Sequence, residues 1–333
     1  MQSAPWSIGR LRRSVCAQSP IVFGRICCHA DSSCSTRGDR TKAARNLAEA
    51  AIARGFKNVH IVTYPLELLE DSGLPLKPME TVSPYSEGIS VDRPRPIGDY
   101  KVLDGRMGAA ISGHIVKLLH RLSGSTIVMD LYLVPHGQMV IQAVDCATRM
   151  DRAPRPFTIS EAVGSDITNV VRESLACDQV GAAALVLQSY LAHDLPVAVS
   201  GFTKQLIIDS GQSVDERLGT NFASQLSSRV RISYPAIDAG ALLQTASAES
   251  ENQAVFNHRE LKPEGYLLFI SRLSRAKGVD DLIAAYRLSN LYGEKPLVIC
   301  GNGPDGERLR QLAGDDPHIR FFADVGDEEK RSL

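Results

Sequence analysis

Short apolar runs alternate with polar turns and amphipathic segments along most of the chain. The runs are rich in Val, Ile, Leu and Phe and have the length of buried strands, whereas the segments between them repeat apolar residues at helical spacing. The stretch 266–313 shows this best, with apolar runs at 267–270 and 297–300, each followed by a turn and a helical pattern. Strands that alternate with helices predict an α/β fold with parallel sheets.

The same pattern divides the chain into two domains. Further strands are predicted at residues 21–29, 59–63, 125–133, 157–159, 195–199 and 230–233. Helices are predicted at 41–54, 107–122 and 178–189; one more helix is expected to end at Val144, and another to begin at Ser200. Ser200 and Thr203 are placed as caps of that last helix. Residues 64–100 are rich in proline and predict a long surface loop, and residues 239–262 predict a linker. The expected organisation is a flexible basic leader at 1–20, a Rossmann-like domain at 21–238, the linker, and a second domain at 263–333.

Two loops of the second domain carry the clearest chemistry. Arg272 and Lys277 lie in the turn after the first strand, so both cations can converge on an anion beyond the strand ends. After the next strand, Gly301 and Gly303 lie in a Gly-Asn-Gly-Pro turn where a ligand can approach the backbone, and the helix that follows offers free N–H groups. This combination predicts a site for a phosphate or diphosphate, although each part taken alone is also typical of a solvated loop or a tight turn.

These residues resemble a known family. The patterns S-R-L-x3-K-G-x-D-x-L-I-x-A and L-x-I-x-G-x-G-P, followed by a helix with L-x-x-L-A, are similar to the donor-binding half of family 4 glycosyltransferases, which have the GT-B fold. The resemblance implies two Rossmann-like doubly wound domains, and a diphosphate of a nucleotide-sugar held by Arg272 and Lys277. It also implies hexose transfer with retained anomeric configuration, no metal and no cofactor. No Asp-x-Asp pair occurs, which argues against the metal-dependent class.

A dinucleotide site is the competing interpretation of the glycine turn. Gly301, Gly303 and Gly306 satisfy G-x-G-x-x-G, and Asp324 closes the next predicted strand at about the expected distance. Against an NAD-dependent oxidoreductase, the glycines follow an earlier strand–helix unit, and a proline interrupts the loop. The turn with Arg272 and Lys277 has no role in such a fold, so the nucleotide-sugar interpretation is favoured.

His136 is the first candidate for handling the acceptor in the first domain. It follows the strand predicted at 125–133, and we expect it in a loop at the carboxyl edge of the sheet. A histidine there can bind a sugar hydroxyl or shuttle a proton, and a loop histidine with only local hydrogen bonds is the alternative.

A second candidate follows the strand predicted at 157–159. The residues Gly164, Ser165, Asp166 and Ile167 resemble the end of a His-Gly-Ser-Asp-Ile motif carried by many members of the same family, with Val163 in place of the histidine. The resemblance implies that Gly164 and Ser165 lie on the acceptor side and that Asp166 accepts a hydrogen bond from a sugar hydroxyl or acts as a base.

Gly38 is the counterpart of another family feature. In that family a glycine-rich loop after the first strand approaches the donor phosphates, whereas the loop here reads SSCSTRGDR and contains only Gly38. Arg37 and Arg40 are possible substitutes in that role, with plain solvent exposure as the alternative. The resemblance therefore makes Gly38 a candidate for binding the donor phosphates.

Composition and charge exclude several other classes. The 333 residues have a net charge of −1 and 44% hydrophobic residues, which gives no electrostatic case for nucleic acid as a partner. No apolar run has the length of a membrane span, and the seven cysteines show no C-x2-C pair that would prepare a zinc site. We expect a cytoplasmic protein whose partners are a nucleotide-sugar and an acceptor. The oligomeric state is not predicted.

The two ends of the sequence raise separate expectations. Residues 1–20 contain three arginines and no acidic residue, which is typical of an organelle transit peptide; an unstructured leader and a start codon placed too far upstream are the alternatives. Family members continue beyond the counterpart of Leu333 with a paired-glutamate segment, so the second domain is expected to be incomplete, with apolar surface exposed. A non-catalytic protein that binds a nucleotide-sugar or a partner is therefore the alternative to an active hexosyltransferase.

Overall fold

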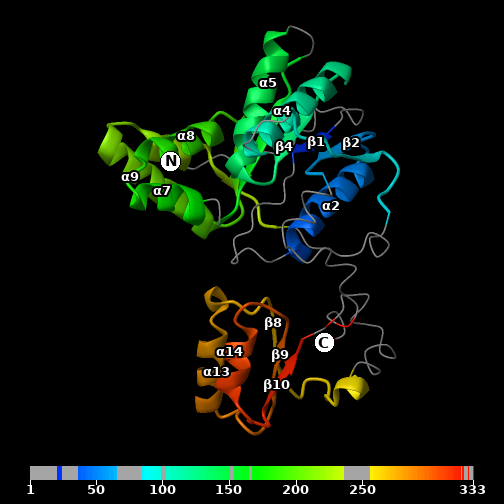
Figure 1. The fold of residues 1–333 in the computed structure, drawn as a ribbon, viewed down its shortest axis with the longest axis vertical. Coiled ribbons are helices and arrows are strands. Elements are labelled where there is room, and N and C mark those ends of the chain that lie inside the picture. The colour runs from blue at the N-terminus through cyan, green and yellow to red at the C-terminus, as the bar shows by residue number, and fades with distance from the viewer. Residues whose placement is uncertain are drawn as a thin grey trace, which may run out of the picture. The chain divides into compact units, whose positions relative to one another are not determined.

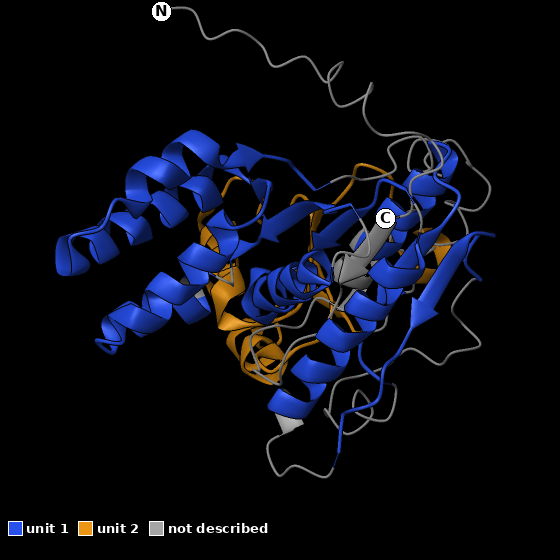
Figure 2. Cartoon of the chain, turned by 90° about the horizontal axis from the view of Figure 1, so that it is seen from above, with its two compact units in different colours: residues 1–29, 40–236 blue, residues 30–39, 237–333 orange. Residues whose placement is uncertain are grey.

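The computed structural model describes residues 21–24, 37–65, 84–98, 103–122, 124–150, 154–164, 167–235, 256–323, 325, 329 and 333. The chain divides into two compact units (Figure 2): unit 1 comprises residues 1–29 and 40–236, and unit 2 comprises residues 30–39 and 237–333. The leader at 1–20 and most of the linker at 239–262 lie outside the described residues, so the predicted domain boundaries stay a prediction. Within the described helices, none is long and apolar enough to cross a membrane.

Unit 1 is built on a parallel sheet. Its described strands are β1 (Ile21–Gly24), β2 (Val59–Val62), β3 (Ile89–Asp92), β4 (Ile127–Asp130), β5 (Phe157–Ala162), β6 (Leu195–Ala198) and β7 (Arg231–Ile232). They follow the order β3-β2-β1-β4-β5-β6-β7, and every pair is parallel. The order reverses between β1 and β4, which is the doubly wound arrangement whose ligand edge lies at the carboxyl ends of the strands.

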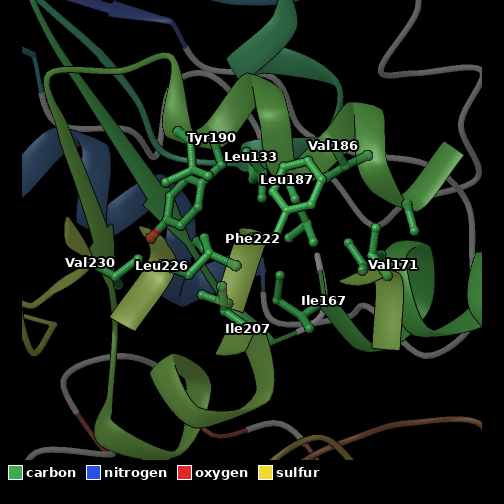
Figure 3. Packing of buried hydrophobic residues seen from close by; sticks show 14 of the residues in the cluster. Leu133, Ile167, Val171, Val186, Leu187, Tyr190, Ile207, Phe222, Leu226 and Val230 are labelled. Carbon is green, nitrogen blue, oxygen red and sulfur yellow. The ribbon is translucent and has the colours of Figure 1, made fainter. Parts of the chain in front are cut away.

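Helices cover this sheet and supply most of the core of unit 1. The described helices are α2 (Arg37–Ala53), α4 (Leu103–Arg121), α5 (Gln138–Arg149), α7 (Arg172–Ala176), α8 (Val180–Leu191), α9 (Gly201–Leu218) and α10 (Phe222–Arg229), with single π-helical turns η2 (Leu133–Gly137) and η3 (Ile167–Val171). One apolar cluster joins α4 and α5 to β2 and β4, and α7, α8 and α9 gather together in Figure 1. In Figure 3, side chains from α8, α9 and α10 point toward one another, among them Tyr190, Leu187, Ile207 and Phe222. These helices therefore bury apolar residues in the core of unit 1.

Local signals in the sequence explain where most of these elements begin. Helix α9 starts after Ser200, whose hydroxyl accepts a hydrogen bond from the backbone N–H of Thr203 at 3.0 Å. Ser200 is the predicted N-cap, whereas Thr203 supplies the capped N–H. Helix α9 ends at Gly219, which has the left-handed conformation (φ 65°) typical of a glycine C-cap.

Several elements of unit 1 differ from the prediction, among them β3, β5 and α2. Strand β3 was missed, because residues 64–100 look like a loop; its residues Ile89-Ser90-Val91-Asp92 form an edge strand, each half-buried, beside a proline-rich flank. Strand β5 continues to Ala162, three residues past the predicted end. Helix α2 begins at Arg37 instead of after Arg40, so Gly38 lies in the first turn of a helix and the predicted loop is wrong at this point.

Unit 2 repeats the first half of the same topology. Its elements are β8 (Leu267–Ile270), the 3-10 turn η4 (Arg275–Lys277), α13 (Val279–Leu288), β9 (Leu297–Cys300), α14 (Gly306–Ala313) and β10 (Ile319–Phe322). The described strands form a parallel sheet in the order β10-β9-β8. The central strand β9 is buried along its whole length, as its run of apolar residues predicts. The predicted strand–helix–strand–helix unit at 266–313 is confirmed.

Each face of this small sheet has its own apolar cluster. Helices α13 and α14 cover one face through Ile283, Tyr286 and Leu309, which pack against inward residues of the strands. On the opposite face, Val298 and Cys300 pack with residues that precede β8 and follow β10. Strand β8 pairs only with β9 among the described strands, and Leu268 and Ile270 are each 39% exposed. The edge at β8 therefore carries exposed apolar surface.

Candidate anion-binding site

The loop between β8 and α13 places the predicted cations at the carboxyl edge of the sheet of unit 2. Arg272 comes two residues after β8 and is half-buried, and Lys277 ends the turn η4 and is exposed. Gly278 then takes the left-handed conformation (φ 60°) and leads directly into α13, so Lys277 lies beside the first turn of that helix. Throughout the described part of the chain, no ion pair or side-chain hydrogen bond engages Arg272 or Lys277. Both charges are available to an anion.

The glycines of the next loop have a structural role that we did not predict. A Cβ atom on Gly301 would lie 2.0 Å from the carbonyl oxygen of Ser271, and one on Gly303 would lie 2.1 Å from that of Leu273. The backbone N–H of Leu273 also donates to the carbonyl of Asn302 at 3.0 Å, and that of Asp305 donates to the carbonyl of Leu273 at 3.1 Å. The backbone at 271–273 and the backbone at 301–305 are therefore interlocked. Glycine is needed at 301 and 303 because any side chain there would overlap the backbone of the other loop. Direct contact of these glycines with a ligand stays a prediction.

Substitution of Gly303 tests this interlock. We expect Gly303→Ala to lower the free energy of unfolding of unit 2 by roughly 3 kcal/mol, because the new methyl group overlaps backbone that cannot move aside as a side chain can. Gly314→Ala is the control within unit 2: a Cβ there meets nothing within 4 Å, so its cost comes from the positive φ of Gly314 (62°), which Gly303 does not share. The control should cost only about 1 kcal/mol, from backbone strain. Equal losses for the two variants, measured by urea unfolding followed by circular dichroism, would argue against the interlock.

Arg308 joins the two helices that begin at this edge, and the sequence analysis missed it. Its Nε and Nη2 atoms donate to the two carboxylate oxygens of Asp305 at 2.6 and 2.7 Å, and Nη2 also donates to Asp280 at 3.0 Å. Asp305 precedes α14 and Asp280 lies in the first turn of α13. Hydrogen bonds from Arg308 lower the pKa of both carboxyl groups, which therefore stay charged near neutral pH. The i, i+3 spacing of Asp305 and Arg308 was the available signal, but it is common on helices.

The candidates in unit 1 lie at the carboxyl ends of different strands. His136 follows β4 as predicted, but it lies in the π-helical turn η2 and not in a loop. It is only 2% exposed and meets the ring of Tyr132 edge to face, with the centroids 6.2 Å apart. This burial counts against direct contact with an acceptor, and a catalytic role for His136 stays a prediction. Gly164 follows β5 and lies close to the Thr203 hydroxyl at the start of α9, whereas Ser165 and Asp166 lie outside the described residues.

A buried polar cluster at the end of β4 was also missed. Asp130 and His193 are both fully buried, and the imidazole Nε2 lies 3.0 Å from an Asp130 carboxylate oxygen. The hydroxyl of Ser160 donates to the other oxygen at 2.9 Å, and His193 Nδ1 donates to the carbonyl of Ser189 at 2.9 Å. Because Nδ1 already carries a proton, Nε2 and Asp130 must share one more proton between them. Burial raises the pKa of Asp130, against the opposing effect of the hydrogen bonds from His193 and Ser160.

The described candidates come from both units. Arg272, Lys277, Gly301 and Gly303 belong to neighbouring loops of unit 2, whereas His136 and Gly164 belong to unit 1. Gly38 lies in the first turn of α2, within the segment 30–39 that belongs to unit 2. Among the described residues, no cluster of three or more His, Cys, Asp or Glu side chains is placed to hold a metal ion.

Three solved structures resemble the chain over most of its length. HepE from Anabaena, solved with UDP and glucose, is 14% identical, with a TM-score of 0.52, and the match covers 95% of this chain and 71% of that one. The N-terminal domain of a trehalose-6-phosphate phosphatase from Candida albicans is 13% identical, with a TM-score of 0.52 and coverage of 95% and 76%. A UDP-forming α,α-trehalose-phosphate synthase from Burkholderia vietnamiensis is 9% identical, with a TM-score of 0.50 and coverage of 94% and 75%. The fold is the predicted α/β fold of Rossmann-like units seen in GT-B proteins.

Part of the sequence of unit 2 also matches the model of a protein family. Residues 250–333 match the family model described as glycosyl transferases group 1, and the match spans β8 to β10 with both interlocked loops. No curated protein matches the sequence. Residues 250–333 are thus similar to glycosyl transferases group 1, and the chain has a GT-B fold, which confirms the predicted resemblance at this level. Assignment to family 4 stays a prediction.

Proposed function

We propose that the chain is a glycosyltransferase that binds a nucleotide-sugar in unit 2 and transfers its sugar to an acceptor bound by unit 1. The observation that carries the proposal is the pair Arg272 and Lys277, two cations without partners among the described residues, beside the first turn of α13. The positive end of a helix and two unpaired cations favour a diphosphate. The family match includes both residues, and HepE was solved with UDP and glucose.

In the proposed reaction, negative charge develops on the diphosphate as its bond to the sugar breaks. Arg272 and Lys277 stabilise that charge. Electrostatic stabilisation of this kind is usually the largest single contribution to catalysis of such a step. The transferred group in this proposal is a hexose, no metal ion is required, and the anomeric configuration is retained, as the resemblance to family 4 implies. Asp166 is the proposed residue that accepts a hydrogen bond or a proton from the acceptor hydroxyl, with Gly164 and Ser165 beside it.

A binding protein without catalysis is the second candidate function. It is favoured by Val163, which occupies the place of the histidine that faces the reacting sugar in the family that the segment resembles. Such a protein would keep the diphosphate site of unit 2 and bind a nucleotide-sugar without turnover.

Calorimetric titration and a donor assay separate the alternatives. We expect the full chain to bind UDP and UDP-glucose, because the described loops present cations for a diphosphate. NAD also contains a diphosphate, but the turn with Arg272 and Lys277 has no role in a dinucleotide fold, so we expect no binding of NAD. Release of UDP from a panel of nucleotide-sugars would then distinguish turnover from binding alone. Binding of NAD without binding of UDP-glucose would refute the glycosyltransferase proposal and favour the oxidoreductase.

A further inference from the structure

We propose that Arg308 is a positioning residue of the anion site: it holds Asp280 and Asp305 so that the cations of the neighbouring loop remain available to a nucleoside diphosphate. The inference rests on the function proposed above, because that function supplies the ligand. It adds to the anion site a residue that is not one of the loop cations, and it assigns the two carboxylates an effect on the binding of the diphosphate.

The first step concerns the loop between β8 and α13. This loop holds a third cation, Arg275, which is exposed and lies between Arg272 and Lys277 in the sequence. Like the other two, it has no ion pair or side-chain hydrogen bond within the described residues. These three cations therefore stay unpaired among the described residues, although Asp280 and Asp305 lie at the starts of the two helices that follow.

The second step concerns those carboxylates. The backbone N–H of Asp305 donates to the carbonyl of Leu273 at 3.1 Å, so Asp305 is fixed against the same loop, and its side chain is only 9% exposed. Asp280 lies in the first turn of α13, two residues after Gly278. Both carboxylates occupy the positive ends of helices, where they would compete with a phosphate for the same field.

The third step is the geometry of Arg308. Its Nε and Nη2 atoms donate to the two carboxylate oxygens of Asp305, at 2.6 and 2.7 Å. The Nη2 atom also donates to Asp280 at 3.0 Å. A planar guanidinium group makes such two-point contacts, which an ammonium group does not. Arg308 is the third residue of α14 and so belongs to a different element from the cationic loop.

These contacts set the charge that a ligand meets. Arg308 engages the two carboxylates, so Arg272, Arg275 and Lys277 keep their charges for an anion. The positive charge of Arg275 also lowers the pKa of Asp305, although less than Arg308 does. The Asp305 carboxylate therefore already interacts electrostatically with a cation of the loop. Without Arg308, Asp305 and Asp280 would pair with the loop cations and repel the diphosphate.

The test measures UDP binding to the full chain by calorimetry over a range of salt concentrations. We expect Arg308→Gln to weaken UDP binding about tenfold and to reduce its salt dependence, because fewer cations remain free. The variant that also carries Asp280→Asn and Asp305→Asn should bind UDP within about threefold of the unaltered chain, since the competing carboxylates are gone. A purely structural role for Arg308 would not give this recovery.

Each contrary result has a distinct meaning. Wild-type affinity in Arg308→Gln, or no recovery in the triple variant when its melting temperature matches that of Arg308→Gln, would overturn the role of Arg308 alone. If Arg308→Gln does not fold, the double variant Asp280→Asn with Asp305→Asn decides: unchanged or tighter UDP binding supports the inference, and weaker binding overturns it. Failure of the unaltered chain to bind UDP would overturn the proposed function as well.

Discussion

Replacement of both Arg272 and Lys277 by alanine is expected to lower kcat/KM for the nucleotide-sugar by about a thousandfold or more. Removal of one group that stabilises developing charge typically costs about a hundredfold to a thousandfold in kcat, and these two cations act on the same diphosphate. The expected loss lies in kcat as well as in KM, because the charge is greatest in the transition state. Steady-state assays with the donor found in the screen measure both constants.

Two companion variants make this result specific. Lys262→Ala removes one exposed charge from unit 2 away from both loops and should leave kcat/KM unchanged. Arg272→Lys keeps the charge but loses the planar fork that binds a phosphate at two points, so it should fall between the wild type and alanine. If the double alanine variant kept its activity, Arg272 and Lys277 would not be the diphosphate site.

The buried pair Asp130–His193 gives the second large effect, on stability. We expect Asp130→Ala to lower the free energy of unfolding by about 3–5 kcal/mol, because it leaves fully buried polar groups on His193 and Ser160 without their partner. Asp130→Asn should cost about 1 kcal/mol or less. Its amide N–H₂ can donate to His193 Nε2 while its carbonyl accepts from Ser160, so the shared proton is replaced by an amide proton.

Urea unfolding of the three forms, followed by circular dichroism, measures this difference. The comparison between alanine and asparagine isolates the hydrogen bonds from the mere presence of a charge. Similar losses for the two variants would mean that the ion pair itself, and not a proton placed between Nε2 and Oδ2, stabilises the end of β4.

The sequence predicted the topology of unit 2 well, for a physical reason. A strand buried on both faces, such as β9, needs a continuous apolar run, and the runs at 267–270 and 297–300 stand out from amphipathic helices even though alternate residues of β8 are exposed at the edge of the sheet. Strand β3 was missed because an edge strand is only half-buried and tolerates polar residues and flanking proline. Its pairing with β2 depends on a partner distant in sequence, which no local pattern contains.

The same distinction holds for the candidate site. Arg272 and Lys277 were predicted because the order of residues along one loop is enough to bring them together. The contact of Arg308 with Asp280 and the pair Asp130–His193 were missed because the partners come from other elements, and their meaning depends on distances of about 3 Å across the fold. The glycines at 301 and 303 were identified, but their packing against the loop at 271–273 was not, since only the structure shows which backbone they approach.

The interlock between the two loops of unit 2 has a consequence for the thermodynamics of binding. Gly301 and Gly303 let the backbone at 271–273 be held by hydrogen bonds from both sides before any ligand arrives. A loop that is already ordered loses little conformational entropy when it binds, so more of the electrostatic attraction is expressed as affinity. Donor binding should therefore show a favourable enthalpy with only a small entropic penalty from the protein, as for a rigid receptor and not for a loop that folds around its ligand.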